Sequence, residues 1–279
     1  MRAVRFRQVD VFTALPFLGN PVAVVLDGDG LTAEQMLRIA AWTNLSETTF
    51  VLPSARASYR LRIFTPRAEM AFAGHPTIGS AHAVREAGLV PAGDGALVQE
   101  CAAGLIALSV AGDGAIFARV PRPRVVPFAP VQPLAALLGA PAGDARVVDV
   151  GPRWIVVALA GADALRRLTP DLVAMTELNR QTDTTGVTVY APADGGVEVR
   201  SFAPLHGISE DPVCGSGNAS VAAHLRATGA IARFPGGRYR ASQGAALGRR
   251  GEIQVVVDGD DVSIGGAAIT VVEGTIRLE

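Results

Sequence analysis

The amino-acid sequence contains one internal repeat, which limits the possible folds more than any other feature. The segments Phe64-Thr65-Pro66 and Ala73-Gly74-His75-Pro76-Thr77 recur, in order, as Phe202-Ala203-Pro204 and Cys214-Gly215-Ser216-Gly217-Asn218. Three further pairs of segments match, around Gly19 and Gly151, Glu47 and Asp183, and Gln99 and Gln243. Along the chain the offsets between paired segments rise without reversal, through 132, 136, 138, 141 and 144 residues. Matching segments in a conserved order indicate a duplicated half.

Each half predicts one α+β unit of about 125–145 residues, a common domain size. We place the halves at residues 1–124 and 125–279, because Pro and Arg are concentrated in Val120–Pro127, the best candidate for a linker. Apolar runs and alternating patterns predict strands, and a Thr followed by Glu and Gln predicts a helix start. The expected strands are Val22–Leu26, Tyr59–Phe64, Ile155–Leu159 and Val197–Phe202, and the expected helices are Thr32–Thr43, Thr77–Glu86 and Asn218–Thr228.

Composition excludes several classes of protein. Hydrophobic residues make up 49% and charged residues 18% of the chain, enough apolar material for a sizeable core and too little charge for a disordered protein. The formal net charge of −1 lacks the basic excess of a nucleic-acid binder. Lysine is absent, so Schiff-base chemistry, a pyridoxal-phosphate aldimine, a P-loop lysine and a lysine general base are excluded.

The cysteine and histidine pattern predicts a cytoplasmic protein without a metal centre. Cys101 and Cys214 make no disulfide framework and lack the spacing of zinc ligands, and no two of the four histidines form an HxH or HxxxH pair. The first ten residues contain no apolar stretch typical of a secretion signal. The longest apolar runs are far shorter than the roughly 20 residues that span a bilayer, so we expect no membrane segment.

Both glycine-containing segments precede a predicted helix of small residues. Backbone N–H groups at a helix start carry the positive end of the helix dipole, so they can bind an anion. Two such helix starts, related by pseudo-symmetry across a cleft between the halves, could hold a small carboxylate without lysine. Taken alone, each segment is more typical of an ordinary helix-capping turn.

Two residues of the first half are candidates for proton transfer. Glu47 follows a predicted helix and leads into an apolar strand, where partial desolvation would raise its pKa towards a useful range. His75 lies at a predicted helix start, where the dipole disfavours the charged imidazole and suits a neutral relay. An exposed loop glutamate and a capping histidine are the structural alternatives, and the pattern alone leaves both open.

The second half offers an acid and a thiol. Asp211 precedes Pro212 and lies three residues before Cys214, so it could orient His75 or a substrate amine, or serve only as a turn residue. Cys214, at a helix start, would have a lowered thiol pKa and could act as a base. The matching position in the first half is Ala73, so a mechanism with two thiols is excluded.

The sequence resembles the PhzF-like phenazine-biosynthesis family over nearly its whole length. The segments that carry this resemblance are Asp10-Val11-Phe12-Thr13, Gly19-Asn20-Pro21, Asn44-Leu45-Ser46-Glu47-Thr48, Phe72-Ala73-Gly74-His75-Pro76-Thr77, Glu210-Asp211-Pro212-Val213-Cys214-Gly215-Ser216-Gly217-Asn218 and Gln243-Gly244. The resemblance implies the diaminopimelate-epimerase-like fold, in which each of two halves wraps a sheet around a central helix. It also implies that the final strand, Ile269–Leu278, returns to the first half.

The resemblance further implies a function and roles for particular residues. The expected activity is a cofactor-free isomerisation of a small carboxylate similar to trans-2,3-dihydro-3-hydroxyanthranilate, in a homodimer. Glu47 would be the general acid/base. The residues expected to bind substrate or relay protons are His75, Asp211, Ser216, Gly74, Gly215 and Gln243. The alternatives are a one-thiol epimerase or dehydratase that uses Cys214, and a non-catalytic binding protein on the same fold.

Overall fold

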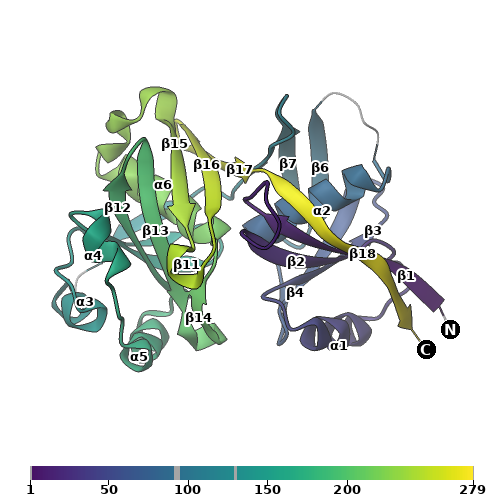
Figure 1. Ribbon diagram of the computed structural model, residues 1–279, viewed down its shortest axis with the longest axis horizontal. Helices are drawn as coiled ribbons and strands as arrows, with labels where there is room; N and C mark the ends of the chain where they lie inside the picture. The colour runs from purple at the N-terminus through teal and green to yellow at the C-terminus, as the bar shows by residue number, and fades with distance from the viewer. Residues whose placement is uncertain (1, 91–94, 129–130, 279) are drawn as a thin grey trace. The chain divides into compact units, whose positions relative to one another are not determined.

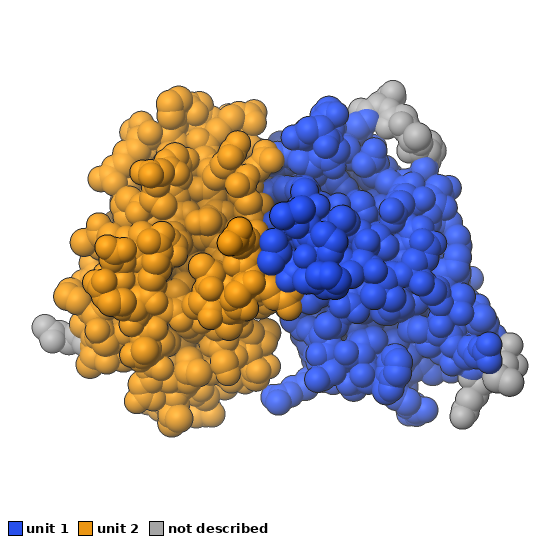
Figure 2. Space-filling view, viewed as in Figure 1, with its two compact units in different colours: residues 1–119, 265–279 blue, residues 120–264 orange. Residues whose placement is uncertain are grey.

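The computed structural model describes residues 2–90, 95–128 and 131–278, which form two compact units (Figure 2). The first unit contains Met1–Arg119 and Gly265–Glu279, and the second contains Val120–Ile264. The predicted limits of the duplicated halves, 1–124 and 125–279, stay a prediction, because contacts group residues by proximity and not by ancestry.

The first unit combines strands with two helices (Figure 1). Its strands are β1 (Arg2–Val11), β2 (Asn20–Val25), β3 (Thr48–Leu52), β4 (Tyr59–Phe64), β5 (Glu69–Met70), β6 (Ala96–Cys101), β7 (Gly104–Val110), β8 (Ile116–Arg119) and β18 (Ala268–Leu278). Its helices are α1 (Ala33–Thr43) and α2 (Gly74–Glu86). The final strand, β18, pairs antiparallel with β1 along its whole length, so the first unit is built from both ends of the sequence.

The second unit has the same kinds of element. Its strands are β9 (Arg124–Pro127), β10 (Ala145–Asp149), β11 (Arg153–Ala158), β12 (Gly186–Ala193), β13 (Gly196–Ala203), β14 (Ile208–Asp211), β15 (Arg238–Gln243), β16 (Gly251–Asp258) and β17 (Asp261–Gly266), whose last two residues belong to the first unit. Its α-helices are α3 (Val131–Leu138), α4 (Ala162–Arg166), α5 (Leu172–Thr182) and α6 (Gly215–Ala227). Four short 3₁₀ helices are η1 (Pro204–His206), η2 (Ala230–Arg233), η3 (Pro235–Gly237) and η4 (Ala245–Leu247).

Strand pairing follows one order in both units. In the first unit β2 pairs parallel with β3, β3 antiparallel with β4, β4 parallel with β6, and β6 antiparallel with β7. In the second unit the same alternation joins β11, β12, β13, β15 and β16. The shared order gives the sequence repeat a structural counterpart.

The two helices that follow the glycine segments are buried on nearly every side. The helix α2 contacts β1, β2, β3, β8 and β18, and α6 contacts β9, β10, β11, β12 and β16. Ten residues of each helix are buried, most of them small, which explains why neither helix has an amphipathic pattern. Each unit therefore wraps its strands around a central helix, as the family resemblance implies.

Both central helices begin three residues earlier than predicted. The sequence predicts starts at Thr77 and Asn218, but α2 begins at Gly74 and α6 at Gly215. Pro76 fits the first helical turn, because its missing N–H would have no intrahelical partner there. The glycine segments are thus the first helical turns themselves. The predicted linker also differs, because its second part forms β9, which pairs with β10.

Other helices and strands match the predictions from the sequence closely. Thr32 caps α1: its hydroxyl accepts from the backbone N–H of Gln35, whose side chain accepts in turn from the N–H of Thr32. This reciprocal pair is the expected product of the Thr-Ala-Glu-Gln pattern. The helix packs Met36 and Ala40 against Phe50 and Phe64. The predicted strand Tyr59–Phe64 coincides with β4.

Candidate active site

The first unit brings Glu47 and His75 together. Glu47 lies immediately before β3, and its backbone carbonyl accepts from the N–H of Ala23 on β2, at 3.3 Å. His75 is the second residue of α2. Glu47 Oε2 lies 3.2 Å from His75 Nε2, and the two residues are only 8% and 4% exposed. A buried carboxyl group therefore faces an imidazole at a helix start.

The electrostatics of His75 favour its uncharged form. Burial lowers the pKa of His75 to about 3, and a hydrogen bond to the carbonyl of Pro21 offsets only part of this effect. The contact with Glu47 is therefore a carboxyl group against a neutral ring at pH 7. On the other side of the ring, Asn20 Nδ2 lies 3.4 Å from His75 Nδ1. A neutral imidazole can donate a proton to, or accept one from, the carboxyl group, according to its tautomer.

Gly74 is the first residue of α2, and Ala73 occupies the N-cap position. Ala73 provides no side-chain hydrogen bond to the helix start, unlike Thr32 at α1. The backbone N–H groups of this turn therefore keep their positive potential uncapped by the N-cap side chain. The helix start therefore presents positive potential of the kind that favours an anion.

In the second unit, Cys214 takes the N-cap position of α6. Its sulfur accepts a hydrogen bond from the N–H of Gly217 at 3.3 Å and lies 3.6 Å from the hydroxyl of Ser216. Gly215 and Ser216 are the first two residues of the helix. Cys214 is buried and Ser216 half-buried, so the hydroxyl is the more accessible of the two polar groups.

Asp211, the last residue of β14, lies beside this helix start. Burial raises the pKa of Asp211 to about 6, while hydrogen bonds from the Val213 N–H and the Cys214 side chain oppose the shift and the nearby Glu210 charge adds to it. Although Asp211 is half-buried by its exposed area, protein atoms crowd its carboxyl group. Near neutral pH this carboxyl group is therefore close to its titration range.

Gln243, at the end of β15, is almost fully buried and holds the start of α6 in place. Its side-chain oxygen accepts from the backbone N–H of Cys214 at 3.2 Å and from Asn218 Nδ2 at 2.8 Å. Its Nε2 donates to the backbone carbonyl of Asp211 at 2.9 Å. One amide thus holds the end of β14 against the first turn of α6.

The sequence profile of one family, PhzC-PhzF or phenazine biosynthesis-like protein, matches residues 9–274. The chain belongs to this family. Antisense-enhancing sequence 1 of Schizosaccharomyces pombe is 38% identical to it, over 96% of this chain and 97% of that protein. Trans-2,3-dihydro-3-hydroxyanthranilate isomerase of Pseudomonas aeruginosa is 35% identical over 79% of each chain.

Solved structures agree with this membership. A PhzF-family phenazine biosynthesis protein of Bacillus anthracis superposes with a TM-score of 0.87 at 27% identity, covering 100% of both chains. A hydroxyproline epimerase from Agrobacterium vitis has a TM-score of 0.70 at 16% identity, over 99% of this chain and 91% of that one, which shows a shared fold alone. The predicted α+β, epimerase-like fold is confirmed.

In this PhzF-family protein the predicted correspondence of Glu47 with Asp183 in the two halves is wrong. Asp183 is the C-cap of α5 in the left-handed conformation, the role that Asn44 has after α1. Its side chain is exposed and pairs with Arg153. The strand registers align Thr48 with Val187, so the residue equivalent to Glu47 is Gly186. The second unit therefore has no acid at the position equivalent to Glu47.

The sequence reasoning missed three polar side chains beside the predicted site residues. Asn20 contacts His75, Trp154 Nε1 donates to the hydroxyl of Ser216 at 3.1 Å, and Asn218 bonds Gln243. Asn20 and Asn218 belong to segments that carry the family resemblance, so both could have been proposed. For Trp154, the only sequence signal was that tryptophan is rare in this chain, with two residues in all.

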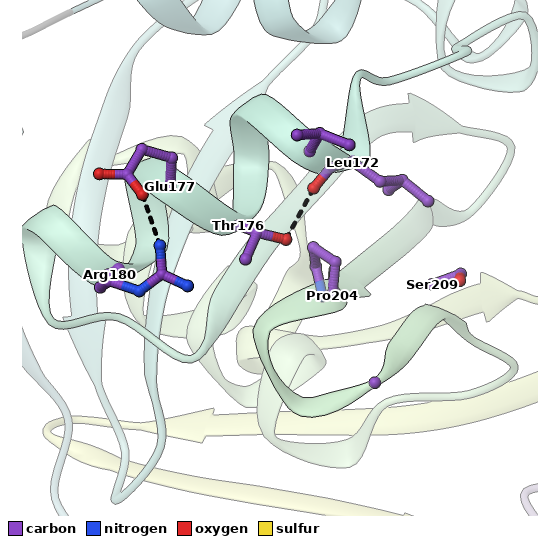
Figure 3. Close-up of a pocket in the computed structure, with 8 residues that line it drawn as sticks. Leu172, Thr176, Glu177, Arg180, Pro204 and Ser209 are labelled. Carbon is purple, nitrogen blue, oxygen red and sulfur yellow. Dashed lines mark hydrogen bonds and ion pairs between the residues drawn. The ribbon is translucent and has the colours of Figure 1, made fainter.

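A surface pocket of about 480 Å³ lies elsewhere in the second unit (Figure 3). It lies between α5 and the turn around η1, and its lining includes Leu172, Thr176, Arg180, Pro204 and Ser209. None of the predicted site residues lines it. Within residues 2–90, 95–128 and 131–278, no group of three His, Cys, Asp or Glu residues could hold a metal ion. Over the same residues, no helix has the length and apolar character that crossing a membrane requires.

Proposed function

We propose that this protein is a cofactor-independent isomerase that relocates a proton on a small, ring-borne carboxylate, with Glu47 as the general acid/base. The observation that carries the proposal is the 3.2 Å contact between the buried Glu47 carboxyl group and His75. Family membership supports the reaction class, because several relatives are named isomerases. The Pseudomonas aeruginosa relative supports a substrate similar to trans-2,3-dihydro-3-hydroxyanthranilate.

The substrate and the product of this isomerisation contain the same atoms. The Glu47 carboxylate takes a proton from one ring carbon, the electron pair of that C–H bond moves into the conjugated system, and Glu47 returns the proton to a second carbon. His75 stays uncharged because burial lowers its pKa to about 3. It can therefore hydrogen-bond either form of Glu47 without holding the carboxyl group permanently ionised, as a cationic partner would.

The other predicted site residues are proposed to bind the substrate. The first-turn N–H groups of α2, beginning at Gly74, and of α6, beginning at Gly215, provide positive potential for a carboxylate. Ser216 offers an accessible hydroxyl, and Asp211 offers a carboxyl group that titrates near neutral pH. Gln243 supports these groups through its contacts with the start of α6.

The proposal is tested by turnover of trans-2,3-dihydro-3-hydroxyanthranilate in deuterated water, with deuterium on carbon measured by NMR. The Glu47→Gln variant should lose at least about 100-fold in turnover, as expected for removal of a general acid/base. Glu34→Gln is the matched control, because Glu34 is exposed on α1 and pairs with Arg38 of the same helix. Full turnover by Glu47→Gln would refute the assignment, and binding without any turnover by the wild type would indicate a non-catalytic binding protein.

A one-thiol epimerase or dehydratase is the second candidate. The hydrogen bond from the Gly217 N–H to the Cys214 sulfur favours it, because an N–H donor at a helix start stabilises a thiolate. In this case Cys214→Ala should abolish turnover and Glu47→Gln should not. Unchanged turnover by Cys214→Ala would remove this candidate.

We further propose that the enzyme works in the cytoplasm as a homodimer. Cys101 and Cys214 are buried and are not joined in a disulfide, which suits a reducing compartment. Twofold homodimers are the commonest assemblies of soluble proteins. Light scattering coupled to size-exclusion chromatography tests the dimer, and a monomeric mass would refute it.

A further inference from the structure

The contact between Trp154 and Ser216 joins a strand to the start of the central helix in the second unit. Trp154 is the second residue of β11 and is 3% exposed, and its Nε1–H donates to the hydroxyl oxygen of Ser216 at 3.1 Å. Ser216 is half-buried at the second position of α6. A buried, rigid donor thus contacts an accessible hydroxyl group among the proposed binding residues.

The fold makes a specific space for the indole ring. Trp154 lies opposite Gly186 in the parallel pairing of β11 with β12. A Cβ atom at Gly186 would lie only 2.7 Å from Cζ3 of the indole. The ring therefore depends on the missing side chain at position 186, and the packing leaves it little freedom to turn its N–H away from Ser216.

The chemistry of the two groups determines the direction of the hydrogen bond. An indole N–H can only donate, whereas a serine hydroxyl has one proton to donate and can accept two bonds. Trp154 therefore fills an acceptor position of Ser216 and cannot take its proton. The hydroxyl also lies 3.6 Å from the Cys214 sulfur, a weak acceptor that already receives the Gly217 N–H. The Ser216 proton stays available to a stronger acceptor.

In the first unit, a buried polar side chain also contacts the second residue of the central helix. The repeat aligns Ser216 with His75, which is likewise the second residue of its central helix. Asn20, at the start of β2, contacts the His75 ring at 3.4 Å. In both units, then, a buried polar side chain near the start of a strand contacts the second residue of the central helix, although the residue types differ.

We propose that Trp154 is a positioning residue that keeps Ser216 as a hydrogen-bond donor to the carboxylate of the substrate. A carboxylate only accepts hydrogen bonds, so it requires a partner with a free proton. Trp154 provides this by occupying the acceptor side of the hydroxyl. The inference rests on the proposed function, because the proposed substrate supplies the carboxylate.

The hydrogen bond itself is tested without substrate, through the indole N–H signals in the NMR spectrum of the ¹⁵N-labelled protein. The chain has only Trp42 and Trp154, so two signals are expected, and Trp42→Phe assigns them by removing one. Ser216→Ala should move the Trp154 signal upfield and speed its exchange with deuterium, while the signal of Trp42, which is 77% exposed, stays in place. If the chemical shift and exchange rate of the Trp154 signal are unchanged in Ser216→Ala, the proposal is overturned.

The positioning role is tested by a double-mutant cycle on turnover of trans-2,3-dihydro-3-hydroxyanthranilate. Trp154→Phe keeps an aromatic ring and removes the N–H, and it should raise KM on the order of fivefold, the effect of losing one neutral hydrogen bond, with kcat within about twofold. In the Ser216→Ala background the same substitution should have no further effect on KM. Trp42→Phe, the matched control, should match the wild type.

The outcomes separate the two proposals. An inactive wild type would refute the proposed function and, with it, a carboxylate role for Trp154. An active wild type in which Trp154→Phe raises KM equally with and without Ser216 would leave the isomerase intact and refute the positioning role, because the effect would then be general packing. A fall in kcat with unchanged KM would also refute it.

Discussion

The side-chain amide nitrogen of Gln99 donates a hydrogen bond to the hydroxyl of Thr77 at 3.0 Å. Gln243 and Asn218 make the corresponding contact in the second unit, at 2.8 Å, with the amide of Asn218 as the donor. Each glutamine belongs to the strand that follows the central helix, and each partner is the fourth residue of that helix. A buried amide therefore fixes the first turn of both central helices, where the proposed binding groups lie.

The first prediction concerns the stability that Gln243 provides. Gln243→Leu keeps most of the side-chain volume but leaves the Cys214 N–H and the Asp211 carbonyl without this partner. Because each buried polar group left unsatisfied costs about 1–3 kcal/mol, we expect the free energy of unfolding to fall by about 2–4 kcal/mol in urea titrations. Gln181→Leu, at an exposed position of α5, should change it by less than about 0.5 kcal/mol. Equal losses in the two variants would contradict a specific role for Gln243.

Local sequence signals predicted the elements whose ends are marked by side chains. The capping pattern at Thr32 gave the start of α1, and the alternation in Tyr59–Phe64 gave β4. The starts of the central helices were missed because glycine and proline usually mark turns. In α2 and α6 the same residues allow the backbone to be buried, and burial is a tertiary property that a local pattern does not encode.

In the candidate site, too, local sequence predicted individual residues but not the contacts that the fold creates between them. Glu47 and His75 could be proposed from the sequence because their neighbours predict a strand and a helix start, but their 3.2 Å contact depends on the fold. The pairing of Glu47 with Asp183 failed because short matches in a repeat tolerate a shift of a few residues. The contact of Trp154 with Ser216 could not be anticipated, since it links residues 62 positions apart.

A second prediction tests the close packing of α6. A Cβ atom at Gly217 would lie 2.6 Å from the Ser201 hydroxyl and 2.8 Å from the Thr188 hydroxyl, two groups that hydrogen-bond each other. We expect Gly217→Ala to destabilise the protein by about 1–3 kcal/mol, as overpacking does. At the exposed Gly112 a Cβ atom would meet nothing within 4 Å, so Gly112→Ala is the control and should be nearly neutral. Equal melting temperatures for the two variants would show that α6 can move aside.

A third prediction follows from Asp211. Its pKa is raised to about 6, chiefly by burial, so the carboxyl group loses its proton as the pH rises through about 6. The ionised form repels a carboxylate ligand, and KM for trans-2,3-dihydro-3-hydroxyanthranilate should therefore rise between pH 5 and pH 7. Asp211→Asn should remove this step and leave KM nearly constant. Steady-state kinetics across this range provides the measurement, and a step that persists in Asp211→Asn would assign the titration to another group.

The final prediction concerns acid stability and His75. Its pKa is about 3 in the folded protein and about 6.5 when unfolded, so below pH 6.5 the unfolded chain binds a proton that the folded protein does not. The stability provided by neutral His75 is therefore complete above pH 6.5 and declines as the pH falls towards 3. Between pH 7 and pH 5 this amounts to about 2 kcal/mol.

The wild type should therefore lose more stability between pH 7 and pH 5 than His75→Gln, measured as the difference in urea unfolding free energies. Burial also lowers the pKa values of His82 and His224, but both are present in the two proteins and cancel in the comparison. His206→Gln, at an exposed position of η1, is the matched control and should follow the wild type. Parallel pH profiles for the wild type and His75→Gln would mean that His75 has the same pKa in the folded and unfolded protein. His75 would then become charged below about pH 6.5, and its ion pair with Glu47 would hold the carboxylate ionised instead of free to exchange its proton.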